Sequence, residues 1–127
     1  MKSSEPMDML QLMWLQQHNF VKLLQQRRSW PIDPLDLTQK ENQRFLKSIT
    51  HDCMDELYEA NKELKNSKQH RQMNITEFDR VAYVEELIDA QHFLFEIAIM
   101  SGVTAEEFFA AYMKKGMTNV ARIEMGY

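Results

Sequence analysis

Two short acidic segments hold the residues of this chain that could do chemistry. They read Asp55-Glu56-Leu57-Tyr58-Glu59 and Glu85-Glu86-Leu87-Ile88-Asp89, and both lie within amphipathic sequence of helical character. Carboxylates three or four residues apart share one face of a helix, so two such helices packed together would direct several hard oxygen ligands at one point. The pattern predicts a Mg²⁺ site between helices, and it favours hydrolysis of a phosphate ester or anhydride.

The first acidic segment belongs to a row of carboxylates beside an apolar stripe. At 100° per residue the row falls within roughly 60° of arc, and its members are Asp52, Glu56, Glu59 and Glu63. The predicted apolar stripe consists of Leu46, Ile49, Cys53, Leu57, Ala60 and Leu64. Like charges at this spacing repel, and a bound cation would reverse that repulsion. On the helix that carries the second acidic segment, a similar arc contains Glu85, Asp89 and Glu96, with Glu86 one position round from it.

These acidic clusters have a simpler interpretation, as solvated surface charge on an acidic helical protein. Taken singly, each cluster is explained equally well that way. The two clusters occur on successive long helices, however, and a basic loop and a basic tail follow them. Together they favour the metal site over surface charge.

The composition bounds the class of protein. A chain of 127 residues is one domain by length, and a composition with only 3 Gly and 3 Pro favours long helices. The net charge of −4 argues against binding to DNA, RNA or a membrane surface. A single cysteine excludes an internal disulfide and fits a reducing cytoplasm. No apolar run is long enough to span a bilayer.

Periodicity and capping patterns predict four main helices. The first covers residues 6–28, and a loop over 30–37 with two prolines follows it. The second runs from a capping box at Thr38 and Glu41 to about residue 65. The third starts with Asn74 and Glu77 after a basic loop over 66–73, and it ends at Gly102. The fourth is capped by Thr104 and Glu107 and stops at Gly116, which leaves residues 117–127 as a short helix or an extended tail.

The predicted fold is therefore all-α, an antiparallel bundle of four main helices with a short C-terminal helix or tail, forming a single domain over residues 1–127. The first and third helices carry more apolar surface than one thin bundle can bury. We therefore expect self-association as a dimer or tetramer.

At the acidic segments the chain resembles the all-α nucleoside triphosphate pyrophosphohydrolases, which include the dimeric dUTPases and the MazG-like enzymes. The family pattern, Glu-Glu-x-x-Glu on one helix and Glu-x-x-Asp on the next, is matched by Asp55-Glu56-x-x-Glu59 and Glu86-x-x-Asp89. The chain further resembles the dimeric dUTPase branch at residues 85–93. It does so again at Tyr112-x-x-Lys115-x-x-x-Asn119-x-x-Arg122, with Gly126-Tyr127 at the end. The resemblance covers most of the chain from about Ser48 onward. Because Asp55 replaces a Glu, the first ligand pair is either Asp52 with Asp55 or Glu56 with Glu59.

The resemblance implies a role for particular residues. Mg²⁺, with Mn²⁺ as a substitute, would be held by Glu56, Glu59, Glu86 and Asp89, and Glu59 or Glu56 would orient the attacking water. Phosphate oxygens would be bound by Lys115, Asn119, Arg122 and Lys68. The base would be bound by Gln16, Asn19, Trp30 and Tyr127.

The implied activity is Mg²⁺-dependent hydrolysis of a deoxynucleoside triphosphate, with dUTP favoured, to the monophosphate and pyrophosphate. One alternative is a MazG-like enzyme that prefers dCTP or a purine deoxynucleotide. Another is a non-catalytic helical adaptor whose acidic faces bind a basic partner. The sequence leaves open the number of metal ions and whether water attacks the α or the β phosphorus.

Overall fold

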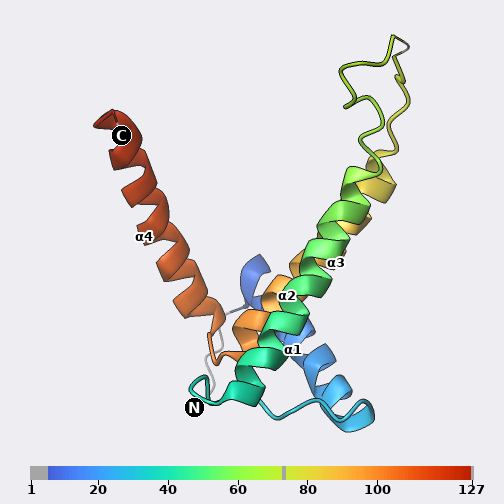
Figure 1. Cartoon of the computed structure of the whole chain (residues 1–127). Coiled ribbons are helices and arrows are strands. Elements are labelled where there is room, and N and C mark those ends of the chain that lie inside the picture. The colour runs from blue at the N-terminus through green and yellow to red at the C-terminus, as the bar shows by residue number, and fades with distance from the viewer. Residues whose placement is uncertain (1–5, 73, 127) are drawn as a thin grey trace. The chain divides into compact units, whose positions relative to one another are not determined.

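A computed structural model describes residues 6–72 and 74–126 of the chain, and within these ranges it contains four helices and no strand. They are α1 (Met9–Arg27), α2 (Lys40–Asn61), α3 (Arg80–Met100) and α4 (Ala105–Glu124) (Figure 1). This confirms the prediction of an all-α protein with four main helices. None of these helices is both long enough and apolar enough to cross a bilayer, in the part of the chain that the structure describes.

The chain divides into two compact units. The central unit is Leu35–Ile97 and contains α2 and most of α3. The terminal unit combines the described residues before and after it, with α1, the last turn of α3 and α4. Both acidic segments therefore belong to the central unit, whereas the predicted phosphate-binding residues of α4 belong to the terminal unit.

In the central unit, α2 and α3 lie side by side (Figure 1). The Cys53 thiol on α2 donates a hydrogen bond to the Ala90 carbonyl oxygen on α3, with 3.3 Å between Sγ and the oxygen. The buried or half-buried face of α2 follows a spacing of three and four residues and consists of Asn42, Phe45, Leu46, Ile49, Cys53, Glu56 and Ala60; the half-buried Glu63 follows just after the end of the helix. On α3, the small side chain of Ala90 is 4% exposed and allows the two backbones to approach closely.

The predicted apolar stripe of α2 was wrong at Leu57 and Leu64. Leu57 and Leu64 are 40% and 41% exposed, while Glu56 and Glu63 are half-buried in the positions expected for the stripe. The buried face is thus rotated toward the acidic row. Ile49 and Ala60, both 2% exposed, determine this rotation, and a residue seven positions after Ile49 must share its face. That residue is Glu56.

Three of the predicted helix starts were also wrong. The first helix begins at Met9 and not at residue 6, because the Asp8 side chain accepts a hydrogen bond from the Gln11 backbone N–H at 2.8 Å. The second helix begins at Lys40, and Gln39 at its N-cap makes no side-chain hydrogen bond. Thr38 instead donates its backbone N–H and its hydroxyl to the Asp36 carboxylate, at 3.0 and 2.7 Å. The third helix begins at Arg80. The Asp79 side chain just before it accepts a hydrogen bond from the Ala82 backbone N–H at 3.0 Å. Asx turns of this kind compete with a capping box.

The start of α4 agrees with the prediction, but its end does not. The Thr104 hydroxyl accepts a hydrogen bond from the Glu107 backbone N–H at 3.1 Å, as the capping pattern indicated. The helix then continues through Gly116 to Glu124, so residues 117–124 are its last turns and not a separate tail. One glycine inside a helix costs only about 1 kcal/mol, which the surrounding helix-forming residues outweigh. The positive φ of 75° occurs ten residues later, at Gly126.

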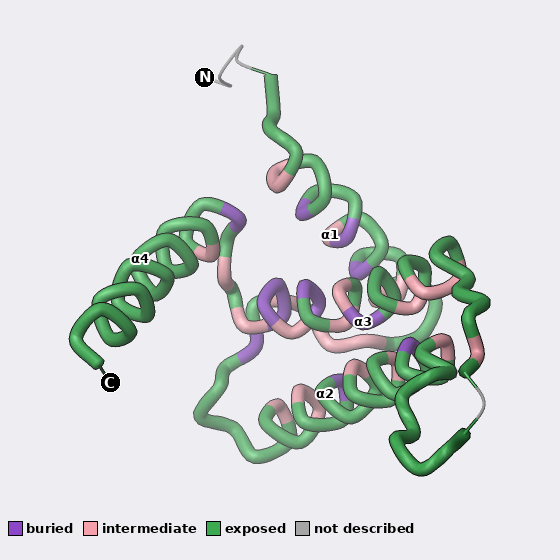
Figure 2. Tube along the Cα trace, turned by 90° about the horizontal axis from the view of Figure 1, so that it is seen from above, coloured by how far each residue is buried: buried purple, intermediate pink, exposed green. Residues whose placement is uncertain are grey.

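In the terminal unit, α1 contacts the first turns of α4. The Trp14 and Phe108 rings are tilted by 50°, with centroids 5.1 Å apart, and Gln11 Nε2 donates to Glu106 Oε1 at 3.0 Å. Between α3 and α4, Gly102 has a φ of 81°, and a β-carbon there would lie 3.0 Å from the Pro34 Cβ. Beyond Phe108, the described residues of α4 are all exposed (Figure 2).

Candidate functional site

Three carboxylates meet between α2 and α3. One oxygen each of Glu56, Glu86 and Asp89 lies within 4.8 Å of the others. Glu56 comes from α2, and the other two residues come from consecutive turns of one side of α3. Glu56 and Glu86 are half-buried, and Asp89 is exposed. The cluster therefore opens to solvent on one side and borders the helix interface on the other.

Helix geometry places two of these carboxylates in the middle of the facing surfaces. Glu56 is one turn after Cys53, whose thiol reaches the Ala90 carbonyl, and Glu86 is one turn before Ala90. Residues separated by three or four positions share a helix face, so Glu56 and Glu86 are directed into the same space as this hydrogen bond. The sequence predicted these carboxylates at the edge of the core, and the structure places Glu56 and Glu86, both half-buried, on the helix faces that contain Cys53 and Ala90.

The electrostatic environment of Glu56 is unfavourable for its charged form. Partial burial, a side-chain hydrogen bond with Glu86 and the negative charges of Asp89, Glu86 and Glu59 all raise the pKa of Glu56. A carboxyl group with a raised pKa and like-charged neighbours is stabilised as an anion when a cation enters. The nearby cation Lys62 pairs with Glu59, with 2.9 Å between its Nζ and Oε1, and its attraction to Glu86 is weaker.

The arrangement fits a small divalent cation. Oxygen ligands about 2.1 Å from an octahedral Mg²⁺ are separated by about 3 Å when adjacent and about 4.2 Å when opposite. Separations within 4.8 Å reach this geometry by small side-chain rotations. The donors are all carboxylate oxygens, which Mg²⁺ and Mn²⁺ prefer over softer ligands.

The fourth predicted ligand, Glu59, lies outside this cluster. Its Oε1 accepts a hydrogen bond from Lys62 Nζ at 2.9 Å, and both side chains are largely exposed. Its charge nevertheless contributes to the raised pKa of Glu56, so it is near the cluster. Asp52 and Asp55 are exposed and do not join the group. Of the two ligand pairs left open by the sequence, the structure thus brings a member of the Glu56 and Glu59 pair to the helix interface.

The predicted phosphate-binding residues lie on two different units. Lys115 and Asn119 line an exposed groove along α4, together with Phe108, Tyr112 and Gly116. Arg122 is one turn further along the same helix and is also exposed. Lys68 is an exposed residue of the central unit, in the segment between α2 and α3. Because α4 continues through Gly116, the helical spacing of Lys115, Asn119 and Arg122 is retained.

The predicted base-binding residues show no common site. Gln16 and Asn19 are exposed on α1, on the side away from its buried residues, which are Trp14, Gln17 and Val21. Trp30 is half-buried in the loop after α1, and Tyr127 lies outside the described residues. The sequence reasoning selected Gln16, yet the neighbouring Gln17 is the buried glutamine, at 4% exposure.

A polar network on α1 was missed entirely. His18 Nε2 and Asp33 Oδ2 are 2.9 Å apart, and Gln25 Nε2 donates to Asp33 Oδ1 at 2.7 Å. Gln25 also donates to the Pro31 carbonyl oxygen at 3.1 Å. The spacing of His18 and Gln25, two helical turns, was a usable signal, because both follow the face defined by Trp14 and Val21.

Comparisons with protein-family models, with curated proteins and with solved structures find no match for this chain. The resemblance to the all-α pyrophosphohydrolases accordingly depends on the acidic and C-terminal motifs themselves.

Proposed function

We propose that this chain is a Mg²⁺-dependent nucleoside triphosphate pyrophosphohydrolase of the all-α superfamily, with dUTP as its favoured substrate and the monophosphate and pyrophosphate as products. We include in this proposal an antiparallel, MazG-like or dimeric-dUTPase-like bundle that acts in the cytoplasm. The observation that carries it is the meeting of Glu56, Glu86 and Asp89 between two facing helices.

The position of these carboxylates supports a metal role over simple surface charge. A solvating acidic group has no reason to occupy the inward face of a helix, where a leucine or alanine would stabilise the fold more. Here Glu56 and Glu86 occupy that face on both partners. Such an arrangement is unfavourable in the free protein and becomes favourable when a divalent cation binds.

Each residue then has a task in hydrolysis. Bound Mg²⁺ would neutralise phosphate oxygens and lower the pKa of a coordinated water. Glu56, Glu86 and Asp89 would hold the metal. Glu59 would orient the attacking water, because its solvent-exposed ion pair with Lys62 is weak and can release the carboxylate. The family resemblance assigns the binding of phosphate oxygens to Lys115, Asn119 and Arg122 on α4 and to Lys68.

Self-association is part of the same proposal. The outer face of α4 presents large apolar side chains at helical spacing, all at least half exposed: Phe109, Met113, Met117, Val120 and Ile123. A contiguous apolar row of this length marks an interaction surface more often than a free one. We therefore propose that the active form is a dimer or tetramer, which would also enlarge the nucleotide site.

A substrate panel with and without metal tests the proposal. We expect pyrophosphate release from dUTP in Mg²⁺, its loss in EDTA, and loss of at least about 100-fold in turnover for Glu56→Gln and Asp89→Asn. Glu85→Gln is the matched control, because Glu85 is exposed, adjacent to Glu86 and outside the cluster. If dCTP or a purine deoxynucleotide were hydrolysed faster than dUTP, that nucleotide would be the favoured substrate, as in the MazG-like alternative. If no nucleotide were hydrolysed in a metal-dependent way, the assignment as an enzyme would fail and the non-catalytic adaptor would be favoured.

A further inference from the structure

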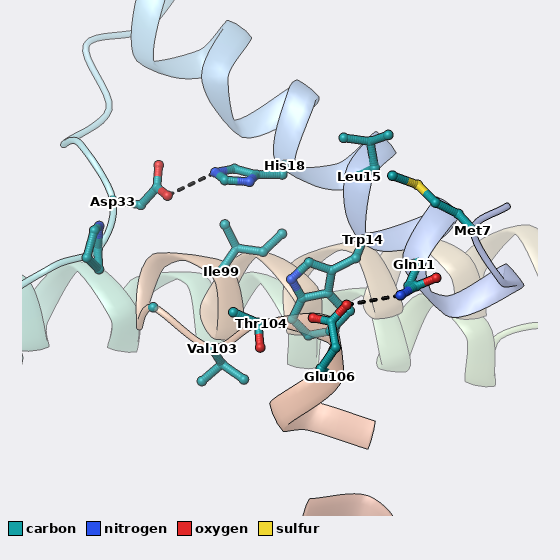
Figure 3. Close-up of a pocket in the computed structure, with 13 residues that line it drawn as sticks. Met7, Gln11, Trp14, Leu15, His18, Asp33, Ile99, Val103, Thr104 and Glu106 are labelled. Carbon is teal, nitrogen blue, oxygen red and sulfur yellow. Dashed lines mark hydrogen bonds and ion pairs between the residues drawn. The ribbon is translucent and has the colours of Figure 1, made fainter. Parts of the chain in front are cut away.

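The terminal unit contains a cavity of about 390 Å³ that the proposed hydrolysis does not use. It is bounded by α1, the loop segment at Asp33 and Pro34, and the turn from α3 into α4 (Figure 3). All of its lining residues belong to this one unit. The volume lies in the range of cavities that bind small organic molecules, about 300–1,000 Å³.

The walls of this cavity are mainly apolar. They include the side chains of Trp14, Leu15, Ile99 and Val103. Trp14 and Ile99 are 7% and 3% exposed, so their positions are held by packing. The tight turn at Gly102 keeps Pro34 against this wall. Such a surface accepts a hydrocarbon chain and gives little hydrogen bonding along its length.

Two carboxylates lie at opposite ends of the apolar wall (Figure 3). At one end, the Asp33 side chain is only 16% exposed and is held by His18 at 2.9 Å and Gln25 at 2.7 Å. At the other end, Glu106 Oε1 accepts a hydrogen bond from Gln11 Nε2 at 3.0 Å. Ile99 and Trp14 lie between the two pairs. Each carboxylate retains lone pairs that a further donor could use.

The charge of the cavity is negative. Burial acts to raise the pKa of Asp33, but the hydrogen bonds from Gln25 and His18 and the attraction to His18 outweigh it, and the pKa is lowered. The hydrogen bond from Gln11 lowers the pKa of Glu106. Both groups are therefore ionised at neutral pH. Among the described residues that line the cavity, there is no lysine or arginine, and His18 beside Asp33 is the one side chain that can carry a positive charge. The two carboxylates disfavour phosphates and other anions.

We infer that this cavity binds an elongated organic dication, a straight hydrocarbon chain with an ammonium group at each end. One ammonium donates to the Asp33 carboxylate and the other to Glu106, while the chain lies against Trp14, Leu15 and Ile99. Charge-assisted hydrogen bonds of this kind are stronger than neutral ones, and the apolar wall favours a methylene chain over water. The site is independent of the acidic cluster between α2 and α3.

Isothermal titration with simple probes tests this inference. The probes are straight-chain diamines of about four to eight carbons, with the diol and the dicarboxylate of matched length. We expect saturable binding of the diamines with an optimum at one chain length, binding of the diol at least about tenfold weaker, and no binding of the dicarboxylate. Equal binding of diamine and diol, or no saturable binding of any diamine, would overturn the inference.

Two matched substitutions separate this site from general attraction to an acidic protein. Glu106→Gln should weaken diamine binding about tenfold, and because Glu106 is exposed the variant should fold. Glu107→Gln removes the same charge from the next position, which does not line the cavity, and should leave the affinity unchanged. Asp33→Asn tests the carboxylate at the other end of the cavity in the same way. If Glu107→Gln weakened binding as much as Glu106→Gln, the inference would fail.

Discussion

At the scale of single residues, Glu56 couples the acidic cluster to folding stability. Its pKa is raised above the usual 4.5, so the folded state holds the proton more tightly than the unfolded chain does. The stability from this group is fully present below the usual pKa and is lost as the pH rises through the raised value. In the folded, metal-free protein, ionised Glu56 is therefore destabilising.

This leads to a prediction about melting temperature. In EDTA, the difference in stability between Glu56→Gln and the wild type should grow as the pH rises from about 4 to about 7, with the variant more stable by up to about 1 kcal/mol at neutral pH. Mg²⁺ should reverse the order, because only the wild type binds the ion through all three carboxylates. Thermal melts at several pH values with and without Mg²⁺ measure both effects. A difference independent of pH would show that Glu56 is not destabilised by its neighbours.

Asp33 affects the pH dependence of stability in the opposite direction from Glu56. Its lowered pKa means that its stabilising contribution is present above the usual value of 3.8 and is lost as the pH falls through the lowered value. We expect Asp33→Asn to destabilise the protein by about 1–3 kcal/mol at neutral pH, because His18 and Gln25 lose a charged acceptor. The effect should shrink at acid pH. Urea denaturation measures it, with the exposed Asp52→Asn as control; an equal loss in both variants would contradict the role of the network.

Part of the site could be predicted from residue spacing. Glu56, Glu86 and Asp89 followed from carboxylates at i and i+3 on two helices. The rotation of α2 could not be predicted reliably, because Leu57 and Leu64 offered an apolar stripe that competed with the one at Ile49, Cys53 and Ala60. The same ambiguity on α1 selected Gln16 in place of Gln17. A shift of one residue rotates a helix face by 100°, and apolar content alone did not decide between the two registers.

At the scale of helices, the two glycines near α4 have opposite roles. A β-carbon at Gly116 would meet no atom within 4 Å, whereas one at Gly102 would lie 3.0 Å from Pro34 with a φ of 81°. We expect Gly116→Ala to stabilise α4 by about 0.5–1 kcal/mol and Gly102→Ala to destabilise the protein. Circular dichroism melts of the two variants test this. Destabilisation by Gly116→Ala would indicate that another molecule packs closely on that face.

Helix existence followed from composition, and helix ends did not. Few glycines and prolines with apolar periodicity were sufficient for four helices. The starts of α2 and α3 depended on which of two nearby acceptors bonds the backbone, and Asp36 and Asp79 prevailed over Thr38 and Asn74. The end of α4 depended on whether one glycine outweighs its neighbours. These are differences of about 1 kcal/mol, smaller than a pattern can resolve.

At the scale of the whole molecule, the exposed apolar row of α4 leads to a prediction about assembly. Val120→Asp should shift the protein toward the monomer, because it places a charge in the row formed by Phe109, Met113 and Met117. Thr118→Asp is the control, since Thr118 lies on the polar side of the same helix. Size-exclusion chromatography with light scattering measures the mass. A monomeric wild type, or an equal effect of both substitutions, would contradict the proposed interface.

The cysteine beside the acidic cluster has a practical consequence. Cys53 is the single cysteine of the chain, and burial between α2 and α3 raises the pKa of its thiol. Alkylation should therefore be slow while the two helices stay together, and slower still when Mg²⁺ draws Glu56 toward Glu86. Mass spectrometry of the alkylated protein would follow the binding of Mg²⁺ to the three carboxylates without any nucleotide present. An unchanged labelling rate on adding Mg²⁺ would count against closure of the helices around the ion.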